Sequence, residues 1–355
     1  MTEQALTTTV GRVRIGHQFL LRMSVALALL VGCVLFSLSQ GAADIPFETT
    51  IRIVMAELHL PVEQDWTATQ ETIVVDVRLP RVLMAAVVGA VLAICGGAYQ
   101  GVFRNPLADP YLIGAASGAA LGGTIAIVSD IDGNYYAASL LTVFAFVGAI
   151  TASFVSFALG RSSREAPTVS LILAGVAVSA FATAVTSLMM LRSEDDLRVV
   201  LSWVLGGFNL ASWDKMWLLL PYAMPAVVVV LLHGRLLNAM QVDDEEAQHL
   251  GVNVGRVRFI LIAAVSVATA AAVSVSGIIG FVGLVVPHAI RLLGIADYRQ
   301  LLPLSALLGG ALLVLADVLA RTIIEPAEIP VGVLTAILGA PFFLLLLQRR
   351  QAVRL

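Results

Sequence analysis

Hydrophobic residues in this chain gather in long runs separated by short polar joints. Ten such runs lie at 19–39, 82–103, 111–128, 137–159, 168–191, 214–233, 257–277, 279–293, 301–320 and 331–347. A run of about 20 apolar residues forms a helix long enough to cross the ~30 Å hydrocarbon core of a bilayer. The pattern therefore predicts an all-α polytopic membrane protein with about ten transmembrane helices.

The composition excludes a water-soluble globular protein. Of the 355 residues, 59% are hydrophobic and 13% are charged, whereas an ordinary soluble domain is about 45–50% apolar and about 25% charged. The net charge of −3 and the lack of a basic block argue against a nucleic-acid partner. Cys33 and Cys95 lie inside apolar runs, so we expect them to pack in the core, with no disulfide, metal site or cofactor.

The polar joints predict one transmembrane domain over residues 1–355. It has tails at 1–18 and 348–355, an outer segment at 40–80 and an inner loop at 234–256. Within the outer segments, residues 50–60 and 198–208 are each expected to form a short interfacial helix. The first apolar run is longer than the core of a signal peptide and lacks a convincing cleavage site, so we interpret it as a retained span.

Basic residues divide unequally between the two sides. If the N-terminus is inside, seven of the 21 Lys and Arg residues lie outside and the other 14 lie inside. The outer seven are Arg52, Arg78, Arg81, Arg192, Arg198, Lys215 and Arg321. Because positive residues are retained in the cytoplasm, both termini are predicted to be cytoplasmic.

Lys215 is the only lysine, and no glycine-rich phosphate loop precedes it. The chain therefore has no Walker A motif, and any ATP hydrolysis that drives it must occur on another polypeptide.

Two arginines, Arg78 and Arg81, bracket Pro80 where the second span is expected to begin. Positive charge at an exposed helix start opposes the helix dipole. One interpretation is interfacial snorkelling of the side chains. The other is a docking site for carboxylates of an external partner, because a guanidinium can bind a carboxylate through two parallel hydrogen bonds.

The most polar inner loop predicts a short helix. Asp243 or Asp244 can cap its start, the carboxylates of Asp244, Glu245 and Glu246 suit the positive end, and Gly251 can terminate it after Leu250. This segment is either a solvated connector or a rigid helix that presses into a partner. In the second case Ala247 and Leu250 are the apolar contacts and the acids form a polar rim.

Asp317 is an ionisable residue inside a predicted span, where such a group usually has a partner. Arg321, one helical turn later, is the expected partner, unless it faces outward. His288, next to Pro287, is expected to be structural. Glycines at four-residue spacing, such as Gly114, Gly118 and Gly122, are expected to let helices pack closely.

Four segments together resemble the FecCD-type family, the permease subunits of importers for iron siderophores, haem and cobalamin. They are RLPR at 78–81, NPLADP at 105–110, GFVGLVVPHAIRLL at 280–293 and EIPVGVLTAILGAPFF at 328–343. Their order and spacing are similar over about residues 70–350. The resemblance implies a type II ABC importer permease with ten helices.

This resemblance also implies partners and roles. It implies a second copy of the chain, two cytoplasmic ATPase subunits, an extracytoplasmic binding protein and a bacterial inner membrane. Arg78, Arg81 and Arg321 match arginines that receive glutamates of the binding protein, and residues 243–251 match the helix that couples to the ATPase. The family usually has glycine where this chain has Asp243, which leaves the first turn of that helix open.

Two other classes compete with an ATP-driven importer. A secondary transporter would use an in-membrane acid to bind a coupling ion, and Asp317 is the candidate. Replacing Asp317 by Asn should then abolish proton-coupled transport but largely spare ATP-driven uptake. An intramembrane enzyme would need a nucleophile and a base within reach, for which Ser274, Ser276 and His288 are available. The sequence does not choose among siderophore, haem and cobalamin.

Overall fold

The computed structural model describes residues 3–41, 43–129, 137–161, 167–192, 196–324 and 327–352. Every regular element in these ranges is helical. In chain order they are α1 (Glu3–Ser39), α2 (Phe47–Glu57), α3 (Ala68–Thr72), η1 (Ile73–Arg78), α4 (Leu79–Val102), η2 (Pro110–Ile113), α5 (Ala115–Val128), α6 (Ala137–Gly160), α7 (Pro167–Arg192), α8 (Leu197–Val204), α9 (Trp213–Leu232), α10 (Gly234–Ala239), α11 (Asp244–His249), α12 (Val254–Ser276), α13 (Val282–Leu292), α14 (Tyr298–Thr322) and α15 (Val331–Ala352).

Each predicted span coincides with a helix, so the all-α prediction is confirmed for the described residues. Within the described ranges, seven helices are long and apolar enough to cross a membrane, and α5, α13 and the first part of α15 are shorter apolar helices. The two predicted short helices of the outer segments correspond to α2 and α8.

The expected tails are largely helical. α1 starts at Glu3 and α15 continues to Ala352, so each helix extends beyond the apolar run that predicted it. The acidic outer residues 130–136 and Arg164 lie outside the described residues.

The second span begins earlier than the hydrophobic pattern indicates. A capping box at Thr67 starts a helix that continues through α3, η1 and α4 to Val102. Pro80 has no N–H to donate and its ring crowds the preceding turn. The turn before it widens into the π-helical segment η1. Arg78 and Arg81 therefore lie well inside a helix, and the prediction that they occupy an exposed helix start is wrong.

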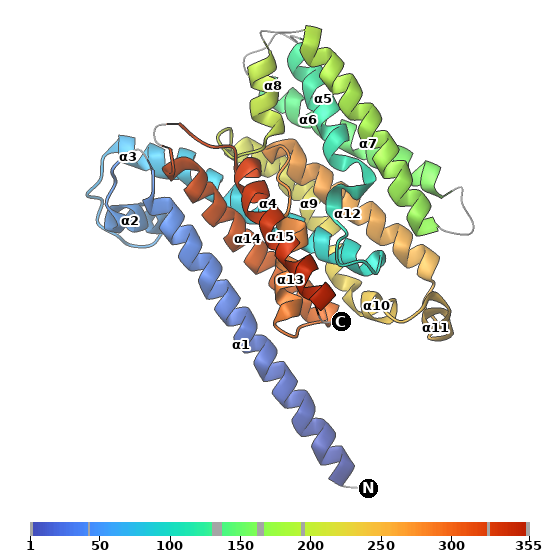
Figure 1. The fold of residues 1–355 in the computed structure, drawn as a ribbon. Helices are drawn as coiled ribbons and strands as arrows, with labels where there is room; N and C mark the ends of the chain where they lie inside the picture. The colour runs from blue at the N-terminus through green and yellow to red at the C-terminus, as the bar shows by residue number, and fades with distance from the viewer. Residues whose placement is uncertain are drawn as a thin grey trace.

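Helix α4 lies at the centre of the bundle and packs against α14, α12 and α13 (Figure 1). In the most apolar windows of the span containing α4 and of α12, 78% of residues are buried, compared with 11% in α1 and 22% in α7. Close helix contact depends on glycine. A Cβ on Gly96 would lie 1.9 Å from the Gly283 carbonyl oxygen of α13, and one on Gly118 would lie 2.3 Å from that of Gly148 in α6.

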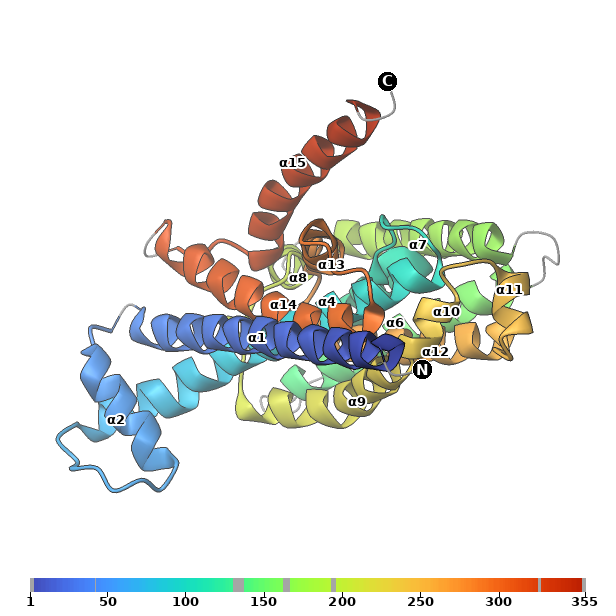
Figure 2. The ribbon, with the colours of Figure 1, turned by 90° about the horizontal axis from the view of Figure 1, so that it is seen from below.

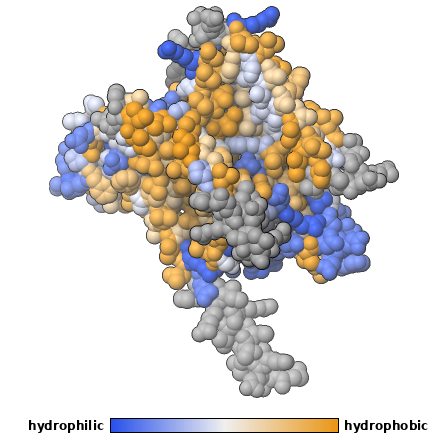
Figure 3. Space-filling model, viewed as in Figure 1, coloured by the Kyte–Doolittle hydropathy of each residue, from blue (hydrophilic) through white to orange (hydrophobic). Residues whose placement is uncertain are grey.

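The polar elements lie at opposite ends of this bundle. Figure 3 shows apolar surface across the helices, with hydrophilic residues near α2 and α3 at one end and near α11 at the other. Figure 2 shows that α15 leaves the bundle at an angle and that α1 runs along one side. We call the end that carries α2, α3 and α8 the outer end, and the end that carries α10 and α11 the coupling end.

Candidate functional site

A buried ion cluster lies at the outer end, formed by Arg81, Asp317, Arg321 and Glu328. The Asp317 side chain is 1% exposed. It accepts hydrogen bonds from Arg81 Nε at 3.0 Å and from Arg81 Nη2 at 2.9 Å, and Arg321 Nε lies 3.3 Å from its Oδ2. One carboxylate thus serves two guanidinium groups from different helices, which joins the start of α4 to the end of α14.

Arg78 and Arg321 both reach the end of α1. Arg321 donates to the carbonyl oxygens of Gln40 at 3.0 Å and of Ser37 at 2.9 Å. Arg78 donates to the carbonyl oxygens of Leu38, at 2.9 Å, and of Ala43. The last carbonyls of a helix lack partners within the helix and carry partial negative charge, so a cation there is favourable. The helix dipole therefore favours the charges of Arg78 and Arg321, contrary to the expectation from the sequence. These arginines face the negative end of α1 and not the positive start of a helix.

The three arginines differ in how much surface they offer to a partner. Arg78 is 4% exposed, and the side chains of Arg321 and Arg81 are 8% and 13% exposed. Arg81 Nη1 and Nη2 lie 2.9 Å and 3.0 Å from the two carboxylate oxygens of Glu328, whose side chain is 42% exposed. Arg81 is therefore the arginine whose partner reaches solvent. Sequence reasoning missed Glu328, although it lies in the EIPVG motif.

The pair of Asp317 with Arg321 is confirmed, and its burial weakens one sequence-based test. Breaking a buried ion pair leaves an uncompensated charge and is strongly destabilising. Asp317→Asn would therefore disturb folding whether transport is driven by ions or by ATP, and it does not separate these two classes.

Helix α11 at the coupling end has the boundaries that its sequence predicts. Asp243 caps it with extended backbone, at φ −128°, and its Oδ1 accepts from the Asp244 N–H. Any residue adopts that backbone conformation, so the absence of glycine at 243 causes no strain. Gly251 follows the helix with φ +83°, a left-handed conformation typical of a helix end.

Two arginines fix this helix to the bundle. Asp244 pairs with Arg104, which precedes η2, and with Arg258 of α12, whose Nη2 lies 3.2 Å from Asp244 Oδ2. Arg104 also donates to the Val242 carbonyl oxygen at 3.1 Å. Sequence reasoning placed Asp244 among free acids and missed both arginines, which lie 140 and 14 residues away in the chain.

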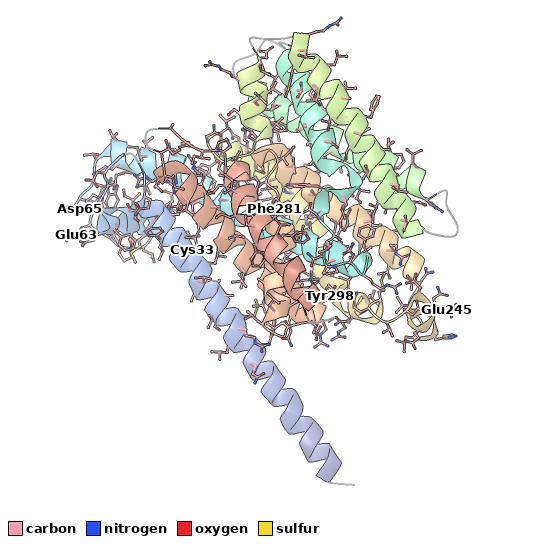
Figure 4. The ribbon with its side chains drawn as sticks, viewed as in Figure 1. Cys33, Glu63, Asp65, Glu245, Phe281 and Tyr298 are labelled. Atoms are coloured by element: carbon pink, nitrogen blue, oxygen red, sulfur yellow. The ribbon has the colours of Figure 1, made fainter. Side chains whose placement is uncertain are left out.

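The predicted partner-facing residues of α11 divide into two groups. Ala247 is fully buried against the bundle, so the expectation that it contacts a partner is wrong for this conformation. Leu250 is 70% exposed, and Glu245 and Glu246 are exposed as well. Figure 4 shows Glu245 at the coupling end, far from Glu63 and Asp65 at the outer end. The arrangement presents one apolar side chain beside two carboxylates.

The hydroxyl groups proposed for an intramembrane enzyme are engaged within their own helix. Ser274 donates to the Ala271 carbonyl oxygen and Ser276 to that of Ala272, each at 2.9 Å. In the described part of the chain, no three His, Cys, Asp or Glu residues lie together as metal ligands would.

The fold and the two ends define a polytopic helical membrane protein with a short polar helix at one end and a buried ion cluster at the other. The FecCD transport family model matches residues 29–349. The chain belongs to the FecCD transport family, and the resemblance drawn from the four motifs is confirmed.

Individual relatives cover most of the chain. It is 44% identical over 288 residues to the cobalamin import system permease protein BtuC of Halobacterium salinarum, covering 80% of this chain and 75% of that protein. It is 40% identical to the hemin transport system permease protein HmuU of Yersinia pestis, covering 94% and 97%. A solved metal-chelate type ABC transporter in an inward-facing conformation is 31% identical and superposes with a TM-score of 0.79, covering 92% of this chain and 98% of that one.

Proposed function

We propose that this protein is the membrane-spanning permease subunit of an ATP-driven importer in the bacterial inner membrane. It carries an iron chelate, such as a siderophore or haem, or cobalamin from an extracytoplasmic binding protein to the cytoplasm. Family membership supports this role, as do relatives that are described as permeases for cobalamin and hemin.

The main structural support for this function is helix α11 at the coupling end. Exposed Leu250, Glu245 and Glu246 stand on a short helix that Arg104 and Arg258 attach to α12 and to the segment after α4. A helix fixed in this way transmits a push from a partner to the spans. The chain has no Walker A motif, so we assign ATP hydrolysis to two partner subunits that contact α11.

The outer end is the proposed docking surface for the binding protein. Of the predicted docking arginines Arg78, Arg81 and Arg321, Arg81 fits this role best, because its guanidinium already holds a partly exposed carboxylate in a two-point contact. A glutamate of the binding protein would take the place of Glu328 on Arg81. Arg78 and Arg321 would support the surface by holding the end of α1 in place.

The remaining features of the proposal are the assembly and its orientation. Two copies of the permease surround a central path, as the family resemblance implies. Both termini face the cytoplasm, as the 14 to seven distribution of basic residues predicts. The coupling end then lies on the cytoplasmic side.

A secondary transporter gains no support from Asp317, because two arginines already neutralise it. Reconstitution tests the two classes directly. The permease, purified from its own membrane with the proteins that remain bound, is placed in liposomes and supplied with labelled haem, cobalamin or ferric siderophore. Uptake that requires enclosed ATP and persists without an ion gradient supports the proposal, and uptake that follows an imposed proton or sodium gradient without ATP contradicts it.

A further inference from the structure

Lys215 lies in an environment that is unusual for a charged residue. It stands in the first turn of α9, and only 6% of its surface is exposed. The described residues offer its ammonium group no hydrogen-bond acceptor and no carboxylate within bonding distance, whereas its backbone N–H bonds to Ser212 Oγ at 3.4 Å. Burial of a cation without a partner costs several kcal/mol. Among the described residues, the ammonium group therefore has no counter-ion.

The side chain lines a cavity of about 340 Å³ at the outer end. The cavity lies among α6, α8, α9 and the end of α12. Arg198 is a second cation on its wall, and Ser202 and Asn209 add side-chain hydrogen-bond donors. Among the described residues that line this cavity none is acidic. Two cations and two neutral donors without an acid form a site for an anion.

The walls of the cavity indicate which anion fits. Leu141, Val199 and Val275 provide apolar surface beside the cations. A carboxylate on a short aliphatic arm matches both the cationic and the apolar part of the lining. Its oxygens would meet Lys215 and Arg198, and its methylene groups would contact the aliphatic side chains. The cavity also shares Ser202, Gly207 and Asn209 with the smaller pocket that contains Arg81 and Glu328. It thus opens next to the proposed docking surface.

We propose that this cavity, which we call the Lys215 pocket, binds a carboxylate group carried on a short aliphatic arm. Two sources offer that chemistry, an acidic side chain of the binding protein or a carboxylate arm of the transported chelate. The choice between the sources rests on the proposed importer function, but carboxylate binding by the pocket does not.

The single lysine makes the test selective. Reductive methylation with ¹³C-formaldehyde labels only Lys215 and the N-terminal amine, and it keeps the positive charge. The labelled permease in lipid nanodiscs is titrated with glutarate and, as a neutral control of similar shape, with glutaramide. We expect the Lys215 resonance to shift saturably with glutarate, at concentrations at least about 10-fold lower than any shift caused by glutaramide. Equal responses to the two compounds would overturn the proposal.

Variants separate binding from folding. By calorimetry, Lys215→Met should weaken glutarate binding at least about 10-fold, whereas Lys215→Arg should retain it within about threefold because the charge remains. Arg198→Gln keeps the labelled lysine, and its shift should require about three- to tenfold more glutarate. Wild-type affinity in correctly folded Lys215→Met contradicts the proposal, and loss of folding in that variant leaves the labelling result and Arg198→Gln to decide.

Two further titrations identify the source. A shift caused by the substrate-free binding protein, and absent with gallium citrate, a diamagnetic stand-in for the ferric chelate, assigns the carboxylate to the binding protein. A shift caused by gallium citrate alone assigns it to the chelate. If ATP-dependent uptake is measured and glutarate fails to act selectively, the Lys215 pocket is excluded while the importer function stands.

Discussion

The outer end and the coupling end both carry charged groups but use them differently. At the outer end, Asp317 is buried and paired with two arginines, so its charge joins α4 to α14. At the coupling end, Glu245 and Glu246 are exposed, whereas Asp243 pairs with Arg104 and Asp244 pairs with Arg104 and Arg258. Burial thus decides whether a charge stabilises the fold or remains available to a partner, because the desolvation cost is recovered only by a fixed counter-ion.

The largest effect is expected from breaking the outer cluster. Asp317→Ala removes the shared carboxylate and leaves Arg81 and Arg321 without it, which should lower the free energy of unfolding by about 3–5 kcal/mol. Thermal denaturation of the detergent-solubilised protein, followed by size-exclusion chromatography, measures the change. Glu245→Ala, an exposed acid, is the control and should behave like wild type. Equal melting temperatures for Asp317→Ala and wild type would show that the cluster contributes nothing to the fold.

At the coupling end, Leu250 should matter for a partner and not for folding. Leu250→Ser removes an exposed apolar contact and should weaken binding of the ATPase subunits by about 1–2 kcal/mol, or about 5- to 30-fold. Pull-down of the ATPase at increasing salt measures this effect. Ala247→Leu is the matched change inside the bundle, and overpacking there should cost about 1–3 kcal/mol of stability. The interpretation fails if Leu250→Ser melts early while still holding the ATPase.

Asp244→Asn tests the attachment of α11. Loss of the pairs with Arg104 and Arg258 should cost about 1 kcal/mol, because all three side chains are partly exposed. Hydrogen exchange of the α11 amides should rise while exchange in α4 and α12 stays unchanged. Glu245→Gln is the control, because Glu245 is an exposed acid of the same helix with no ion pair among the described residues. Unchanged exchange in α11 of Asp244→Asn would contradict the anchoring role.

The smallest effect concerns Glu328. Glu328→Gln removes the charge that competes for Arg81, and it should tighten docking of the binding protein by about two- to fivefold, within the range of a partly exposed ion pair. Surface plasmon resonance at low salt measures the affinity. Arg81→Gln in the same assay should weaken docking. Weaker docking by Glu328→Gln would indicate that Glu328 itself contacts the binding protein.

Sequence reasoning predicted the local features of this protein. The spans follow from apolar runs, α11 from its cap and terminal glycine, and the pair of Asp317 with Arg321 from one helical turn. It failed where a side chain meets residues distant in the chain. Arg78 and Arg321 reach the end of α1, and Arg104 reaches Asp244. No periodicity encodes such contacts, because they depend on how helices pack.

The sequence by itself determined the membrane class, the helices and the family, because hydrophobic length and local capping are properties of contiguous residues. Only the tertiary structure decided which charges are buried. It placed Asp317 between two arginines and turned Ala247 toward the bundle and Leu250 away from it. It also placed Lys215 on the wall of a cavity whose described lining residues include no acid. The physical reason is that the free-energy cost of burying a charged group depends on the dielectric and the counter-ions around it, and the packing of the helices sets both.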